Sequence, residues 1–139
     1  MAKSSPVSVR LAPETFRAAR ELAHRTSRSL GSVVSELAEE ALRIRQHPGI
    51  LFAGPPGGRR ARVEGTGLDV WEVMTVYRDC KENIEQALTI LTHLHARQVE
   101  AAVRYYRSYQ EEIDRLIAEN ERPIEEWQRL HPHIRVWKG

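Results

Sequence analysis

The first 46 residues combine one strand pattern with two helix patterns, and no other feature of the sequence restricts the possible folds as strongly. Residues 6–12 alternate between apolar and polar side chains, which is the period of a half-buried strand, with Val7, Val9 and Leu11 on the apolar face. A lone strand has no partner for its backbone groups, and two short helices enclose too small a core. We therefore expect a homodimer, in which two copies of the strand pair antiparallel and four helices close around them.

The two helix patterns follow the strand directly. Pro13 and Glu14 suit the first turn of a helix, although Ala12 before them is a poor cap. Ser29 is a favourable N-cap and opens the second helix. The apolar residues of that helix recur with the helical period: Leu30, Val33, Val34, Leu37, Ala38, Ala41 and Leu42. In the dimer this stripe would face the apolar side of the paired strands.

The polar face of the paired strands would present Ser8 and Arg10 from each copy to solvent. A two-stranded ribbon fits the major groove of DNA, and the guanidinium of Arg10 matches the acceptors of guanine. Residues 1–46 also carry eight Lys or Arg against five Asp or Glu, whereas residues 70–119 carry six against nine. This distribution favours DNA as the partner of the first module and a different partner for the rest.

The same residues resemble a known family. Residues 7–45, with SVRLAPE at 8–14 and SRSLGSVVSE at 27–36, look like a ribbon–helix–helix DNA-binding domain of the Arc/MetJ/CopG type. Ser27 departs from the family, which commonly has glycine there, and Pro6 replaces a residue that usually reads a base. The resemblance implies that outward strand residues read bases in the major groove and that the start of the second helix holds a DNA phosphate. The implied DNA-binding residues are Ser8, Arg10, Arg28, Ser29, Leu30, Gly31 and Ser32.

Residues 47–120 predict a second, mainly helical domain. Residues 53–60 are rich in glycine and proline and indicate an exposed loop, and a short extended piece is expected at Ala61–Val63. Asp69 with Glu72 and Asn83 with Gln86 have the spacing of helix-capping boxes. Two further helices are expected, one through Val99, Ala102, Val103 and Tyr106 and one from about Glu111. The whole chain is therefore expected to be mainly α.

The second domain also resembles a family. The motifs HPGILF (47–52), RRA (59–61), GTGLDVWEV (65–73), QVEAAVRYY (98–106) and EID (112–114) look like the domain of unknown function family 433 of VapB-type antitoxins. That resemblance implies a winged-helix-like bundle. Gly67 departs from it, because the family usually has arginine at this position.

Together the two resemblances imply a type II antitoxin, which represses its own operon and neutralises a PIN-like endoribonuclease toxin. Residues 121–139 are the expected partner-binding segment, because they are apolar and are interrupted by Pro123 and Pro132. Arg129 and Arg135 could enter the acidic site that such a nuclease carries. The expected toxin-binding residues are Trp127, Arg129, Leu130, Ile134, Arg135, Val136 and Trp137. Alternatively, residues 124–130 form a helix that packs on the second domain.

Other function classes receive no support from the residues. No apolar run approaches the roughly 20 residues that cross a bilayer, and Cys80 is the single cysteine, so we expect a cytoplasmic protein without disulfides or membrane contact. The pairs His93/His95 and His131/His133 do not share a helix face, and residues 54–58 lack the lysine of a phosphate loop. We expect no metal, no cofactor and no catalysis. The alternative function is a free-standing ribbon–helix–helix regulator whose second domain oligomerises or senses a ligand.

Overall fold

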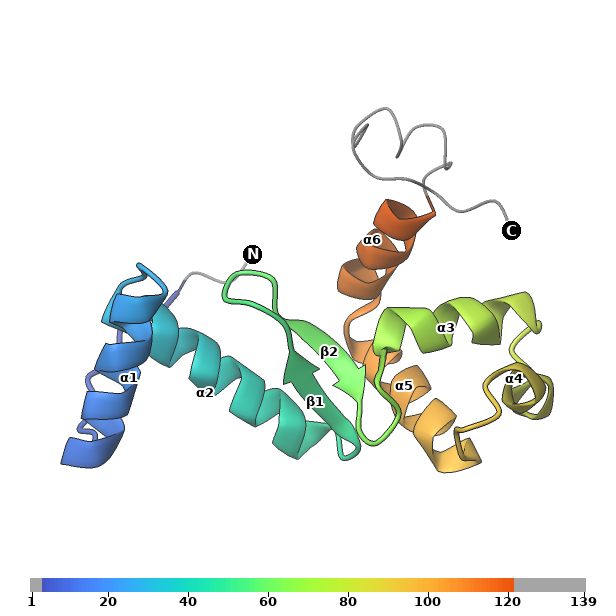
Figure 1. The fold of residues 1–139 in the computed structure, drawn as a ribbon, viewed down its shortest axis with the longest axis horizontal. Helices are drawn as coiled ribbons and strands as arrows, with labels where there is room; N and C mark the ends of the chain where they lie inside the picture. The colour runs from blue at the N-terminus through green and yellow to red at the C-terminus, as the bar shows by residue number, and fades with distance from the viewer. Residues whose placement is uncertain (1–3, 122–139) are drawn as a thin grey trace. The chain divides into compact units, whose positions relative to one another are not determined.

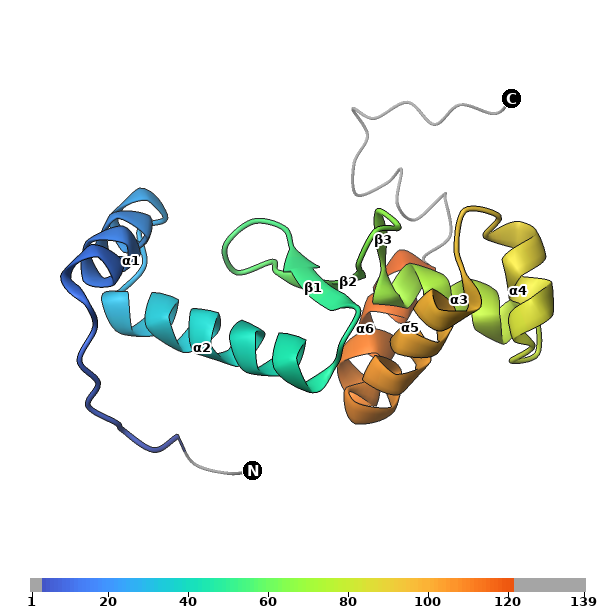
Figure 2. The same ribbon diagram turned by 90° about the horizontal axis from the view of Figure 1, so that it is seen from below.

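The computed structural model describes residues 4–121 of the 139-residue chain. These residues form six helices and one three-stranded antiparallel sheet (Figures 1 and 2). The chain divides into two compact units, Met1–Arg43 and Ile44–Gly139, and each is described by itself. The prediction of a mainly helical fold is confirmed.

The first unit contains an extended segment and two helices. Residues 4–12 form neither helix nor strand within the single chain, and Figure 2 shows them as an extended run that leads into α1 (Pro13–Arg25). Ala12 provides no side-chain cap, as expected from its identity. The longer α2 (Leu30–Gln46) begins directly after Ser29, and both helices start where the sequence predicts. The strand predicted over residues 6–12 needs a second copy to pair with, so the ribbon stays a prediction.

A tight turn joins α1 and α2. The amide of Arg28 donates to the carbonyl of Ala23 at 3.0 Å, and the amide of Thr26 donates to Leu22 at 3.1 Å, which closes the end of α1. Ser27 lies between them with φ 53°, in the left-handed region that favours glycine. The turn therefore holds Ser27 in a backbone conformation that costs less for glycine than for serine.

The first unit buries few side chains. Among its described residues, only Ala19, Ala23 and Val33 are buried. Five large apolar side chains are exposed: Val7 by 79%, Val9 by 61%, Leu42 by 57%, Leu37 by 45% and Phe16 by 42%. The apolar stripe that the sequence predicted to face a core is therefore largely uncovered in one copy of the chain.

The second unit opens with a small sheet. Strands β1 (Ile50–Ala53), β2 (Arg60–Val63) and β3 (Leu68–Asp69) pair antiparallel in the order β1-β2-β3. Ile50 lies opposite Val63, and Arg62 lies opposite Leu51 on one side and Asp69 on the other. The extended piece predicted at Ala61–Val63 is confirmed as part of β2. Strand β1 was not predicted, because its four apolar residues do not alternate with polar ones.

Four helices follow the sheet: α3 (Val70–Asp79), α4 (Ile84–Ile90), α5 (Ala96–Ser108) and α6 (Gln110–Asn120). The caps predicted at Asp69 and Asn83 are present at the starts of α3 and α4. The Glu72 carboxylate accepts from the amide of Asp69 at 3.0 Å, and the Asn83 side chain accepts from the amide of Gln86 at 3.0 Å. At α5 the Gln98 side chain accepts from the amide of His95 at 2.8 Å, a start that the sequence reading missed.

One continuous core holds the second unit together. Helices α3, α5 and α6 contact one another, and α5 also contacts β1 and β2. Tyr105 is fully buried at the centre, and its ring makes edge contacts with His47 and Phe52 while its hydroxyl donates to Glu112 at 2.9 Å. The buried cluster consists of Ile50, Ala61, Val63, Val70, Val73, Met74, Leu91, Leu94, Val99, Ala101, Ala102, Tyr105, Ile113, Leu116 and Ile117.

Two polar networks tie the elements of the second unit together. Buried Asp69 accepts from the guanidinium of Arg62 and from the indole of Trp71, each at 3.2 Å. Arg78 on α3 pairs with Asp114 on α6, and the hydroxyl of Tyr106 on α5 donates to the same carboxylate at 2.9 Å. Within residues 4–121, no helix has the length and apolar character needed to span a bilayer.

Candidate nucleic-acid and dimer interface

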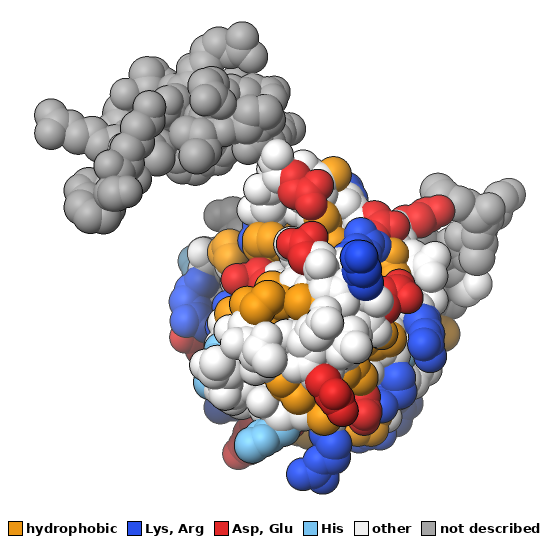
Figure 3. All heavy atoms as spheres, turned by 90° about the vertical axis from the view of Figure 1, so that its right-hand side faces the viewer, with side chains coloured by type: hydrophobic (Ala, Val, Ile, Leu, Met, Phe, Trp, Pro, Cys, Tyr) orange, Lys and Arg blue, Asp and Glu red, His pale blue; other side chains and the backbone are white. Residues whose placement is uncertain are grey.

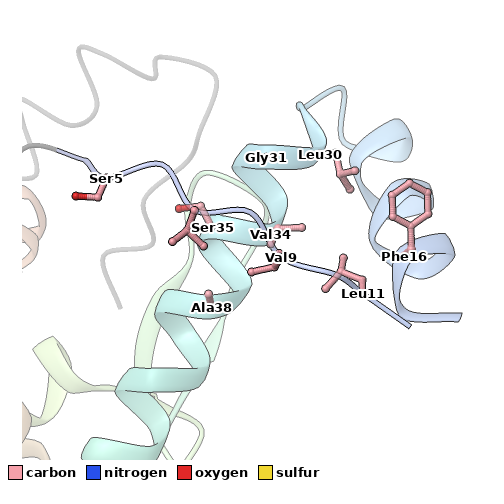
Figure 4. Close-up of a pocket in the computed structure, with 10 residues that line it drawn as sticks. Ser5, Val9, Leu11, Phe16, Leu30, Gly31, Val34, Ser35 and Ala38 are labelled. Atoms are coloured by element: carbon pink, nitrogen blue, oxygen red, sulfur yellow. The ribbon is translucent and has the colours of Figure 1, made fainter. Parts of the chain in front are cut away.

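The extended segment of the first unit lies along an open apolar groove. Figure 4 shows side chains from the segment, from α1 and from α2 arranged around this groove, which has a volume of about 590 Å³. Because the first unit has almost no buried core of its own, these side chains are exposed to water at considerable cost. The groove is lined by Ser5, Val7, Val9, Leu11, Phe16, Leu30, Gly31, Val34, Ser35 and Ala38. We refer to these residues as the apolar groove.

Two of the predicted base-reading residues lie on this extended segment. Ser8 and Arg10 are both exposed, and they alternate along the chain with Val7, Val9 and Leu11. An extended backbone sends alternate side chains to opposite sides. If the apolar side were covered, the hydroxyl of Ser8 and the guanidinium of Arg10 would therefore remain in solvent.

The start of α2 brings the predicted phosphate-binding residues together. The Ser29 hydroxyl oxygen accepts from the amide of Ser32 at 3.0 Å and donates to the Ser32 hydroxyl oxygen at 2.8 Å. The amides of Leu30 and Gly31 belong to the first turn, whose N–H groups have no acceptor within the helix. A Cβ added at Gly31 would meet no atom within 4 Å, so solvent space is open beside this turn. The amide of Ser32 is already used by Ser29, so Leu30 and Gly31 are the positions whose amides could bind an anion.

Arg28 makes a contact that the sequence reading did not anticipate. Its guanidinium pairs with the Glu36 carboxylate at 2.9 Å, and both side chains are about three-quarters buried, with exposures of 26% and 25%. Arg28 precedes the helix, so the usual three- or four-residue spacing of helical ion pairs gave no signal for this partner. Any phosphate held by Arg28 would have to share the guanidinium with Glu36.

The other predicted site lies outside the described part of the chain. All the expected toxin-binding residues fall beyond residue 121: Trp127, Arg129, Leu130, Ile134, Arg135, Val136 and Trp137. The structure describes the DNA-binding candidates at two places, Ser8 and Arg10 on the extended segment and residues 28–32 at the start of α2, and it does not describe these seven.

Several titratable residues of the second unit make contacts that stabilise its fold. His93 contacts the backbone carbonyl of Thr66 at 3.1 Å through Nε2, and the described residues contain no group of three or more His, Cys, Asp or Glu side chains placed to hold a metal ion. The Arg78 guanidinium holds the pKa of Asp114 below its ordinary value, while burial and the bond to Asp114 raise the pKa of Tyr106. Cys80 is buried and free.

The surface of the second unit shows no single charge sign on the side where α4 lies. Figure 3 views the molecule from this side, and Lys or Arg side chains alternate there with Asp or Glu side chains. Gly67 has φ 71°, and a Cβ added there would meet no atom within 4 Å. A side chain at this position would therefore enter open space, at the cost of a left-handed backbone.

In comparisons with known proteins, the chain matches no family model, no curated protein and no solved structure.

Proposed function

We propose that this chain is the antitoxin of a type II toxin–antitoxin system, which binds operator DNA as a homodimer and neutralises a PIN-like ribonuclease. The observation that carries the DNA-binding part is the exposed, alternating segment 7–11 beside an uncovered apolar groove. Val7 and Val9 are more than half exposed there, although their side chains belong to the type that proteins bury. A second copy that pairs with this segment would cover them and would leave Ser8 and Arg10 outside.

In the proposed dimer the paired segments enter the major groove of the operator. Arg10 supplies the guanine contact, and the first turn of α2, with Leu30 and Gly31, supplies backbone amides for the flanking phosphates. The pairing with Glu36 makes Arg28 a weaker phosphate ligand than its charge alone indicates. Repression of the chain's own operon follows if the dimer occupies the promoter.

The proposal that the chain neutralises a toxin rests on the family resemblance of residues 47–120 and on the composition of residues 121–139. Trp127 and Trp137 are the anchors that we expect to enter a groove of the toxin, with Arg129 and Arg135 beside its acidic site. If residues 121–139 bind no partner, the chain is instead a free-standing regulator, and the same DNA-binding unit serves that role.

The DNA-binding proposal is tested by fluorescence anisotropy on the promoter fragment upstream of the gene. Arg10→Ala should weaken binding by roughly 5- to 150-fold, equivalent to about 1–3 kcal/mol, and should reduce the preference over unrelated DNA. The matched control is Arg20→Ala, which removes an exposed charge from α1 and should change affinity only slightly. Equal loss in both variants would mean that charge alone drives binding, and no loss at Arg10 would refute the ribbon.

The antitoxin proposal is tested by co-purification with the product of the neighbouring reading frame. Trp127→Ala should weaken capture by about 2 kcal/mol or more, close to thirtyfold, while promoter binding stays unchanged. Failure of the unaltered chain to capture that product or to rescue growth would leave the free-standing regulator as the function.

A further inference from the structure

A cavity in the second unit lies between the start of α5 and the chain that enters β1. It has a volume of about 400 Å³, within the range of small-molecule sites, and it belongs to neither proposed interface. Its lining combines cationic and amide side chains with a small apolar floor: Pro48, Gly49, Glu64, His95, Arg97, Gln98, Ala101 and Arg104.

The close approach of the chain to α5 at the floor of this cavity requires glycine at position 49. Gly49 has φ 93°, and a Cβ added there would come within 3.2 Å of the Ala101 Cβ. Gln98 fixes one wall, because its Oε1 accepts from the amide of His95 at 2.8 Å and its Nε2 donates to the carbonyl of Glu64 at 3.2 Å. The start of α5 is thereby tied to the end of β2. The hollow is thus held open by backbone geometry and does not need a ligand to form.

Arg97 and Arg104 are seven residues apart on α5, so both lie on the side of the helix that lines the cavity. Elsewhere in the second unit, Arg62 pairs with Asp69 and Arg78 pairs with Asp114. Among the residues described, neither Arg97 nor Arg104 forms an ion pair, although Glu64 lines the same cavity and Glu100 precedes Arg104 by four residues. Two guanidinium groups therefore remain available beside one carboxylate.

We propose that this cavity binds a phosphate ester of about nucleotide size. Guanidinium groups match phosphate oxygens with paired hydrogen bonds, and the two arginines provide this contact from one wall. The volume exceeds what a lone inorganic anion fills, and the floor of Pro48, Gly49 and Ala101 suits the organic group that carries the phosphate. The ester is either a free nucleotide or a nucleotide unit of a DNA backbone, since both present the same chemistry.

The test is an amide NMR titration of the full chain with three probes: adenosine monophosphate, a short duplex DNA of unrelated sequence, and succinate. The proposal predicts shifts at Gly49, Gln98 and Ala101 with the monophosphate, with the duplex or with both. A response to the monophosphate identifies a free-nucleotide site, and a response to the duplex alone identifies a backbone contact. Both results support phosphate recognition. Succinate should bind at least about tenfold more weakly than the phosphate ester.

Matched variants test whether the shifted amide signals report binding in the cavity. The double variant Arg97→Ala/Arg104→Ala should weaken phosphate binding about tenfold or more, and Arg97→Glu/Arg104→Glu should abolish it. Arg107→Ala, an exposed arginine on α5 outside the cavity, should leave it unchanged. Arg10→Ala should also leave these shifts unchanged, which separates this site from operator binding. The proposal is overturned if no probe shifts these amides, if succinate binds as tightly as the phosphate ester, or if the double variant still binds normally.

Discussion

The second unit buries most of its large apolar side chains within one chain, whereas the first unit leaves five of its own more than two-fifths exposed. Tyr105, Ile113 and Val73 are almost completely buried in the second unit. In the first unit, Val7 and Val9 are exposed although they form part of a regular apolar pattern. Both units have well-placed helix starts, so local signals do not explain the contrast. This contrast is what we expect if the second unit folds as a single copy and the first unit pairs with a second copy.

Removal of the central aromatic ring tests whether the second unit is stable by itself. Tyr105→Ala should destabilise this unit by about 3–5 kcal/mol, because it empties the centre of the core and removes the bond to Glu112. Tyr105→Phe keeps the ring and should cost about 1 kcal/mol. Urea unfolding followed through amide NMR signals of each unit measures both effects. Equal loss of stability in the first unit would show that the two units are not independent.

The next effect tests whether the first unit needs a second copy. Val9→Asp should cost about 3 kcal/mol or more in the first unit, because pairing would bury an uncompensated carboxylate in the dimer core. Ser8→Asp, on the opposite side of the segment, should cost little. Far-UV circular dichroism melting at fixed chain concentration compares the two variants. If Val9→Asp changes stability by less than about 0.5 kcal/mol, as expected of an exposed residue, no pairing occurs.

A smaller effect compares the turns of the two units. Ser27 in the first unit and Lys81 in the second both have left-handed backbone, with φ 53° and 54°. Ser27→Gly and Lys81→Gly should each stabilise their own unit by about 0.5 kcal/mol, because relief of the left-handed strain exceeds the entropy cost of glycine. The alanine variants at both positions retain the strain and serve as controls. Destabilisation by either glycine would indicate that the side chain makes a necessary contact.

The smallest effect concerns the pH dependence of the second unit. The hydrogen bond from Arg78 lowers the pKa of Asp114 in the folded chain below its ordinary value of 3.8. The pair therefore stabilises the fold above that ordinary pKa, and this contribution disappears as the pH falls through the lowered folded-state value. Both side chains are partly exposed, so its size is about 0.5 kcal/mol. Asp114→Asn should remove this part of the acid sensitivity in urea unfolding between neutral and acidic pH, and an unchanged acid profile would show that the pair contributes nothing.

Local sequence signals predicted most of the helices in both units. Ser29, Asp69 and Asn83 marked helix starts because their side chains or spacing satisfy the first amides of a helix, and these signals do not depend on distant residues. Strand β1 was missed because its residues are apolar on both sides and show no alternation. The start of α5 was missed because Gln98 completes it together with His95, a residue that rarely serves as an N-cap.

Contacts between distant residues were beyond the sequence patterns. The ion pair between Arg28 and Glu36 depends on how the elements pack, and so do the hydrogen bonds from Arg62 and Trp71 to Asp69. No fixed spacing in the sequence predicts these contacts. The cavity beside Arg97 and Arg104 likewise forms only when Gly49 approaches Ala101. The predicted ribbon differs from these cases, because its partner is a second chain and it depends on an interaction between copies.

Pairing of the first unit with a second copy of itself can be measured by sedimentation equilibrium of the full chain. We predict a dimer of about 32 kDa, twice the 16.0 kDa of one chain, that dissociates when Val9 is replaced by aspartate. A stable 16.0 kDa monomer that retains the helices α1 and α2 at micromolar concentration would contradict the account.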